Sequence, residues 1–362
     1  MRPTQQLHDL GQSLWLDNIT RSLLTTGTLQ RYITELSVSG LTSNPTIFDT
    51  AIRNSSDYDS AIREKLAAGR SGEDLFFDLA LEDITAAADL FRPIHDASNG
   101  LDGWASLEVS PKLAYDADST LKAATELHAR ANRPNIFIKI PGTPEGLPAI
   151  EAAIAAGVPV NVTLLFSTRQ YLAAAEAYLR GLERRLDAGL NVFVPSVASL
   201  FISRWDRAVA QEVPRTMHNI LGIAVAKETY AAFRSVITWP RYARLANAGA
   251  RPQRLLWAST GTKDPDASDV LYVKALQAPF TINTMPEQTL LDFADHGEIG
   301  ELLPADGGDS AATLRAFEDA NVDVYDLANQ LQKDGAESFV KSWNDLLACL
   351  EAKSGQLTGA HW

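Results

Sequence analysis

Short apolar runs alternate with longer segments of helical spacing along most of the chain. In the clearest run, Asn135–Thr143, three isoleucines alternate with Asn135, Phe137 and Lys139 before Pro141-Gly142 ends the pattern. A period of two and β-branched residues are typical of a buried strand. Similar runs predict seven more strands: Ser13–Asn18, Leu36–Leu41, Trp104–Val109, Val158–Phe166, Asn191–Ser196, Arg254–Ala258 and Pro279–Asn283.

The segments between these runs have the spacing and the capping signals of helices. Ser71-Gly72-Glu73-Asp74, for example, resembles a capped helix start. The predicted helices are Thr20–Leu36, Ile47–Gly69, Ser71–Ile94, a helix after Pro111 that ends at Arg130, Pro144–Ala156, Ser167–Asp187, Leu200–Gln211, Asn219–Ala248, Asp264–Ala275 and several within Pro286–Lys353.

Strands that alternate with helices favour parallel pairing with both faces of the sheet covered. Eight such units predict an α/β fold of the (β/α)₈ or TIM-barrel type rather than an open doubly wound sheet. No Gly-x-Gly-x-x-Gly follows the first predicted strand, which disfavours a dinucleotide-binding fold. Because no repeat, low-complexity tract or long linker interrupts the pattern, we expect one domain over residues 1–362. The helices after Leu302 should pack on the outside of the barrel or cover one of its mouths.

Composition says little about the fold, but it restricts the class of molecule that the protein can bind. The chain has 362 residues, of which 46% are hydrophobic and 21% are charged, and its formal net charge is -13. That charge disfavours a general nucleic-acid or acidic-membrane binder, since no global positive field attracts phosphates. A small anionic substrate needs only a local basic cluster and is not disfavoured.

The remaining compositional signals concern location and metals. Cys349 is the only cysteine, so no internal disulfide forms, which is consistent with a reducing compartment. The start of the chain has no apolar core of signal-peptide type, and we expect a cytoplasmic protein. The six histidines show no metal-ligand spacing, which disfavours a metal-dependent enzyme. We also expect no cofactor. The sequence leaves a monomer and a homodimer equally open.

Polar residues stand at the end of every predicted strand. In a (β/α)₈ barrel, catalytic groups lie at the C-terminal ends of several different strands. Alternation puts Ser106 with Glu108 on one face of their strand, and Asn161 with Thr163 on one face of theirs. The polar strand ends are Asp17, Ser43 with Asn44, Glu108, Lys139, Asn161 with Thr163, Ser196 with Ser199, Ser259, and Asn283 with Thr284.

Lys139 is the unusual member of this set, because it lies within an apolar strand. Burial of an amine disfavours its charged form, and a neutral amine can attack a carbonyl and form a Schiff base. Structural roles remain open for each residue alone: Lys139 could extend to water, Asp17 could cap a helix, and Ser43-Asn44-Pro45 could be only a turn. As a set at strand ends, they favour a catalytic site.

Several motifs in this order resemble those of transaldolases, over about Gln12–Lys353. They are Leu16-Asp17-Asn18, Gly40-Leu41-Thr42-Ser43-Asn44-Pro45-Thr46, Ser106-Leu107-Glu108-Val109, Ile138-Lys139-Ile140-Pro141, Asn161-Val162-Thr163-Leu164-Leu165-Phe166-Ser167 and Ser199-Leu200-Phe201-Ile202-Ser203-Arg204. The run Trp257–Lys263 and the long C-terminal region are similar to one bacterial branch of the family.

The resemblance implies a metal-free (β/α)₈ enzyme that transfers a dihydroxyacetone unit from a ketose phosphate to an aldose phosphate. It implies that Lys139 forms the Schiff base, that Asp17 is the acid/base, and that Glu108 with Thr163 handles water. The residues implied to bind substrate are Ser43, Asn44, Asn161, Ser199, Phe201, Arg204, Ser259 and Lys263.

One position departs from the family pattern. Many members carry a second phosphate-binding arginine after strand seven, where this chain has Thr262-Lys263. Lysine also binds phosphate, as a point charge. Two rival functions remain: an aldolase of similar fold that uses the same imine, and a sugar-phosphate-binding barrel without catalysis. A binding protein has no use for a buried amine, which favours an enzyme.

Overall fold

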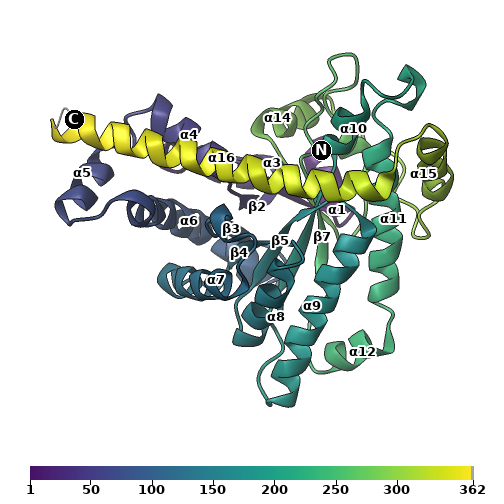
Figure 1. Ribbon diagram of the computed structural model, residues 1–362, viewed down its shortest axis with the longest axis horizontal. Helices are drawn as coiled ribbons and strands as arrows, with labels where there is room; N and C mark the ends of the chain where they lie inside the picture. Colours follow the sequence, from purple (N-terminus) through teal and green to yellow (C-terminus); the bar gives the residue numbers. More distant parts are fainter. Residues whose placement is uncertain (360–362) are drawn as a thin grey trace.

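The protein forms a closed barrel of eight parallel strands in a computed structural model that describes residues 1–359 (Figure 1). Each strand pairs with the next in the chain, and the last strand pairs with the first. The strands are β1 (Ser13–Leu16), β2 (Val38–Thr42), β3 (Trp104–Glu108), β4 (Ile136–Pro141), β5 (Val160–Leu165), β6 (Ser196–Phe201), β7 (Arg254–Ala258) and β8 (Ile282–Met285). The predicted TIM-barrel fold is confirmed.

The barrel is surrounded by helices, most of which connect its strands (Figure 1). These are α1 (Pro3–Asp9), α2 (Arg21–Thr25), α3 (Thr28–Leu36), α4 (Pro45–Asn54), α5 (Asp59–Ala67), α6 (Gly72–Ala97), α7 (Ala117–Ala131), α8 (Gly146–Ala156), α9 (Thr168–Asp187), α10 (Ser203–Val209), α11 (Leu221–Val236), α12 (Pro240–Asn247), α13 (Leu271–Ala275), α14 (Glu287–His296), α15 (Ser310–Asp319) and α16 (Val324–Thr358). Short 3₁₀ turns lie at Pro111–Leu113 and Arg215–Met217.

Several predicted helices are divided or shortened for local reasons. Gly27, with a φ of 76°, separates α2 from α3, and Pro240 starts a new helix after α11. Only Leu271–Ala275 of the segment 264–275 is helical. Gly and Pro were visible in the sequence, but the apolar spacing on both sides of them made each region look continuous.

Two predicted strands were misplaced toward the N-terminus. The sixth strand is Ser196–Phe201, not 191–196, because hydrogen bonding with β5 and β7 begins only after Pro195. The eighth strand is Ile282–Met285, not 279–283, because Phe280 has a φ of 65° and turns the chain before pairing starts. Ser196 therefore lies at the start of its strand and bonds to the Val160 carbonyl, away from the C-terminal mouth.

The N-terminal mouth of the barrel is filled by stacked aromatic rings. Phe137 stacks on Trp104 with ring centroids 4.1 Å apart, and Trp15 lies 6.1 Å from Phe137. Gly40 makes room for this cluster, since a Cβ there would lie 2.6 Å from the Trp15 indole. The interior of the lower barrel is thus a packed core. A surface cavity of about 570 Å³ lies outside this core at the same mouth, where Ser13, Ser39 and Arg254 line it.

The last helix, α16, lies across the barrel at the C-terminal mouth (Figure 1, yellow). Gln332 on α16 donates to the Gly142 and Leu164 carbonyls, at 3.0 and 2.9 Å, just beyond β4 and near the end of β5. Trp343 donates to Glu73 on α6, and its ring packs against Phe76. The C-terminal region therefore covers one mouth, as expected from the sequence. None of the helices in residues 1–359 is long and apolar enough to cross a membrane.

Candidate active site

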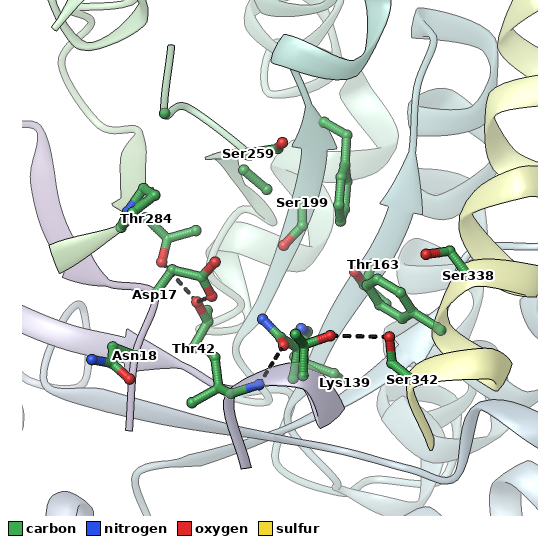
Figure 2. A pocket seen from close by; sticks show the side chains of 18 of the residues that line it. Asp17, Asn18, Thr42, Lys139, Thr163, Ser199, Ser259, Thr284, Ser338 and Ser342 are labelled. Atoms are coloured by element: carbon green, nitrogen blue, oxygen red, sulfur yellow. Dashed lines mark hydrogen bonds between the residues drawn. The ribbon is translucent and has the colours of Figure 1, made fainter. Parts of the chain in front are cut away.

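A cavity of about 510 Å³ opens at the C-terminal mouth of the barrel (Figure 2). Its walls come from strand ends, from the loops that follow them, and from one turn of α16. Of the residues predicted from the sequence, those that line it are Asp17, Asn44, Lys139, Thr163, Ser199, Phe201, Arg204, Ser259, Lys263 and Thr284. The strand-end pattern therefore located the cavity.

Lys139 projects from β4 toward the floor of this cavity. Its Nζ donates to the Ser43 carbonyl at 2.9 Å and to Glu108 Oε2 at 3.3 Å. The parallel register explains the second contact, because Lys139 pairs directly with Glu108 of β3. The amine and the carboxylate are both buried, at 5% and 4% exposure. A buried amine held beside one carboxylate can exchange a proton locally.

Glu108 and Thr163 each have an oxygen with no hydrogen-bond partner among residues 1–359. These atoms are Glu108 Oε1 and Thr163 Oγ1, and both are buried. Burial raises the pKa of the Glu108 carboxyl, although the nearby Lys139 charge opposes this effect. Buried polar atoms without a partner are rare and commonly hold water or a ligand. The two groups flank Lys139, on β3 and β5.

Asp17 follows β1 and extends its ladder, because its N–H donates to the Met285 carbonyl at 2.8 Å. Its Oδ1 accepts from the Thr42 hydroxyl at 2.7 Å, and Thr42 is also within 2.7 Å of Thr284 Oγ1. Burial raises the pKa of Asp17, against the attraction of Lys139 and the Thr42 hydrogen bond. The helix-cap role is excluded, because Thr20 caps α2.

Asn44 and Ser43 differ in their access to the cavity. Asn44 caps α4 by accepting from Ile47 N with Oδ1, and it lines the cavity. Ser43 does not line it: its hydroxyl donates to the Ser106 carbonyl at 2.8 Å, and its own carbonyl accepts from Lys139. Ser43 therefore orients the amine rather than facing the open space.

A hydrogen-bonded chain crosses the barrel beneath the cavity. Ser199 Oγ donates to Asn161 Oδ1 at 2.7 Å, and Asn161 Nδ2 donates to Ser106 Oγ at 3.2 Å. Asn161 and Ser106 are fully buried, and neither lines the cavity. The chain fixes the amide orientation of Asn161, whereas Ser199 reaches the cavity wall.

Two cations stand on the wall next to β6 and β7. The Arg204 guanidinium carbon lies 5.0 Å from the centre of the Phe201 ring, and burial lowers the pKa of Arg204. Lys263 is exposed at the rim. Within residues 1–359 no carboxylate forms an ion pair with either side chain. Between them, the Ser259 hydroxyl lies 2.9 Å from Ser203 Oγ.

The sequence did not reveal two groups of lining residues. Asn18 and Glu287 line the cavity with Asp17, and Asn18 Nδ2 donates to Glu287 Oε2 at 3.0 Å. Glu287 Oε1 also accepts from the Tyr32 hydroxyl. Burial and that contact raise the pKa of Tyr32 to about 12. Correct placement of β8 would have put Glu287 near a strand end. The other group, on α16, has no signal in the strand pattern: it consists of Ser338, Phe339 and Ser342.

The cavity thus combines a buried amine with nearby carboxyl groups and with two cations that form no ion pair in residues 1–359. A carbonyl at Lys139 would meet the amine, the Glu108 carboxyl and the Asp17 carboxyl from different strands. An anionic end would find Arg204 and Lys263 without competing carboxylates. Among residues 1–359, no three His, Cys, Asp or Glu side chains are grouped as metal ligands.

Comparisons with known proteins agree with this arrangement. Residues 14–350 match the model of the family described as Transaldolase/Fructose-6-phosphate aldolase. A transaldolase of Thermobifida fusca (strain YX) is 45% identical over 354 residues, 95% of this chain and 96% of the relative. A transaldolase of Arthrobacter sp. (strain FB24) is 42% identical over 358 residues, 96% of each chain.

Proposed function

The chain belongs to the transaldolase/fructose-6-phosphate aldolase family, and we propose that it transfers a dihydroxyacetone unit from a ketose phosphate to an aldose phosphate through an imine at Lys139. Its named relatives make it a transaldolase, an enzyme of the transferase class. The observation that best supports imine formation is the buried Lys139 amine on the cavity floor, which donates hydrogen bonds to the Ser43 carbonyl and to Glu108.

Binding would place the substrate phosphate beside Arg204 and Lys263. Both cations line the cavity next to β6 and β7, whereas Asp17 directly follows β1. Phosphate sites of such barrels commonly lie in the late βα loops. With the phosphate there, the carbonyl end reaches the floor, where Lys139, Asn44 and Ser199 meet it.

Imine formation begins when the Lys139 amine attacks the ketose carbonyl carbon. A new C–N bond forms, and the carbonyl oxygen leaves as water after taking up protons. Glu108, 3.3 Å from Nζ, supplies and recovers the proton. The unpartnered Glu108 Oε1 and Thr163 Oγ1 hold the departing water. Burial raises the pKa of Glu108, which favours its protonated form and suits a group that gives up and recovers a proton.

Cleavage breaks the bond between the α and β carbons of the bound sugar. Asp17 removes the proton of the β hydroxyl, which becomes the carbonyl of the leaving aldehyde. The electron pair of the broken bond moves into the protonated imine and gives an enamine on Lys139. Thr42 holds the Asp17 carboxylate in place at 2.7 Å.

Transfer reverses these steps with a second aldehyde. The enamine carbon attacks the aldehyde carbon, and Asp17 returns its proton to the new hydroxyl. Water then hydrolyses the imine and frees Lys139. Because the enamine remains covalently held, the first aldehyde can leave and the acceptor can enter.

A coupled assay with fructose 6-phosphate and erythrose 4-phosphate tests this function. We expect glyceraldehyde 3-phosphate and a seven-carbon ketose phosphate, formed in equal amounts and only when the acceptor is present. Release of free dihydroxyacetone at the same rate without an acceptor would instead identify the aldolase activity of the family. No turnover under either condition would contradict both.

Sugar phosphates are the partners that this function requires. We also propose that the protein works in the cytoplasm, where sugar phosphates are available and where a single free thiol, Cys349, stays reduced.

A further inference from the structure

The Arg204 side chain lies in a recess that α16 completes. Its guanidinium carbon is 5.0 Å from the Phe201 ring and 5.7 Å from the Phe339 ring. The two rings also contact each other, with centroids 6.5 Å apart at 61°. Arg204 therefore lies in a corner between one ring from β6 and one from α16.

Gly335, one turn before Phe339, forms the other side of this recess. A Cβ at Gly335 would lie 3.2 Å from Arg204 Nη1 and 2.9 Å from the Leu164 side chain. Glycine inside a helix costs roughly 1 kcal/mol relative to alanine, so its presence indicates a close approach. Here the close approach is to Arg204 and to β5.

The rest of α16 is fixed against the barrel at this point. Gln332 fixes the position of α16 along the barrel, because its amide donates to two carbonyls, those of Gly142 and Leu164. Leu164 has a φ of 59° where the β5 register shifts. Gln332, Gly335 and Phe339 follow at spacings of three and four residues and share one face of the helix.

We propose that Phe339, with Gly335, positions Arg204 for the substrate phosphate, so that α16 sets the enzyme's discrimination between phosphorylated and unphosphorylated sugars. This rests on the proposed role of Arg204 in phosphate binding. Aromatic rings attract the guanidinium through its charge. Unlike a carboxylate, they leave its N–H donors free. Phe339 is a positioning residue, because it acts through Arg204.

Arg204 is the only cation of the cavity held in this way in residues 1–359. Lys263 is exposed at the rim and contacts no ring. A flexible lysine contributes charge but little direction, whereas a planar guanidinium of fixed orientation can bind phosphate with two parallel donors. The recess therefore supplies the directional part of phosphate recognition.

The test compares two acceptors, erythrose 4-phosphate and erythrose, with fructose 6-phosphate as donor. The ratio of their kcat/KM values measures discrimination for the phosphate. In Phe339→Leu we expect this ratio to fall about 3- to 30-fold, through a higher KM for erythrose 4-phosphate at nearly unchanged kcat. Phe339→Trp, which keeps an aromatic face, should restore most of the ratio.

Two matched controls separate positioning from general support of α16. Phe77→Leu removes another partly buried ring that packs on this helix, 5.5 Å from Trp343, without touching Arg204. It should leave the ratio unchanged. Gly335→Ala should lower the ratio, whereas Gly355→Ala, twenty residues along the same helix, should not. A purely structural role would lower both kcat/KM values together in Phe339→Leu.

A double-mutant cycle with Arg204→Ala tests whether Phe339 acts on phosphate discrimination through Arg204. If Phe339 acts through Arg204, adding Phe339→Leu to Arg204→Ala changes the ratio no further. A second, additive loss, or an unchanged ratio in Phe339→Leu alone, would overturn the inference. An unchanged ratio in Arg204→Ala itself would instead reject the phosphate role of Arg204 on which the inference rests.

Discussion

The two mouths of the barrel both contain buried charge, but they use it differently. At the N-terminal mouth, Arg254 is buried and donates to the Leu101, Phe280 and Thr281 carbonyls and to Ser13 Oγ. At the C-terminal mouth, Glu108 Oε1 and Thr163 Oγ1 have no partner among residues 1–359. Arg204 there has aromatic neighbours instead of a carboxylate.

The difference separates stability from function within one fold. The Arg254 donors bind oxygens of the protein itself. The guanidinium therefore stabilises the contacts between strands and loops at this mouth. The groups at the other mouth keep unused hydrogen-bonding capacity, which a substrate can satisfy. Burial raises the pKa values of Asp17 and Glu108, which means that ionising these carboxyls is less favourable in the folded protein than in the unfolded chain.

The largest expected effect is the loss of turnover in Lys139→Ala. No other group at the cavity floor can form the imine, so activity in the coupled assay should fall to the detection limit. The fold should persist, because the removed amine contributes two hydrogen bonds at the edge of a cavity. Circular dichroism and thermal unfolding check the fold, and measurable turnover by the folded variant would contradict the assignment.

Asp17→Asn should lower kcat by about 10²–10⁴-fold, the usual contribution of a positioned acid/base. The amide can still accept from Thr42 but cannot take the hydroxyl proton. Reductive trapping of the imine should continue in this variant, since imine formation does not use Asp17. Near wild-type turnover would remove Asp17 from the mechanism.

Arg254→Met, at the N-terminal mouth, should lower stability and leave turnover nearly unchanged, which is the opposite of the result expected for Lys139→Ala. Removing the guanidinium takes the donor from the Leu101 and Phe280 carbonyls, whereas the Thr281 carbonyl still accepts from the Ser13 N–H. Each group left unsatisfied costs about 1–3 kcal/mol. We expect the free energy of unfolding in urea to fall by about 2–4 kcal/mol, with kcat near that of wild type at low temperature. Arg92→Met, which removes an exposed pair with Asp96, is the matched control and should change little.

Arg204→Ala tests whether the free charge serves the substrate. We expect the KM for fructose 6-phosphate to rise by about 10- to 100-fold, since charge-assisted hydrogen bonds are worth roughly 1.5–3 kcal/mol. The effect on unphosphorylated erythrose should be much smaller. Equal losses for both would reject the phosphate role, and a fully active Lys263→Ala would remove Lys263 from it.

The smallest expected effect concerns stability and pH. The folded-state pKa of Asp17 is raised, so the folded protein holds this proton more tightly than the unfolded chain. Its contribution to stability is therefore present at low pH and is lost as pH rises above about 4, the ordinary aspartate range. Asp17→Asn should gain stability relative to wild type as pH increases through that window. If Asp17→Asn instead lost stability relative to wild type as pH increased, the raised pKa would be contradicted.

The sequence predicted the strand-borne part of the site because a strand has a simple period. Lys139, Glu108 and Thr163 follow from alternation and from the rule that barrel sites lie at strand ends. Their neighbourhood in space follows from the parallel register. β7 was placed at its observed limits because Arg254–Ala258 is a continuous run between turn signals.

The errors arose where that period is weak. Ser196 and Ser199 interrupt the apolar pattern of β6, and Pro279 and Phe280 extend an apparent strand ahead of β8. The roles of Phe339 and Gly335 had no local signal, because they depend on where a 35-residue helix crosses the barrel. Such contacts between distant segments are set by tertiary packing.

Reductive trapping of the imine shows directly whether Lys139 is the residue that bonds to the substrate. The enzyme is incubated with fructose 6-phosphate, reduced with borohydride, digested and mapped by mass spectrometry. We expect a three-carbon adduct on the peptide that contains Lys139, and none in the Lys139→Ala variant. An adduct on a different lysine, or turnover with no adduct at all, would contradict it.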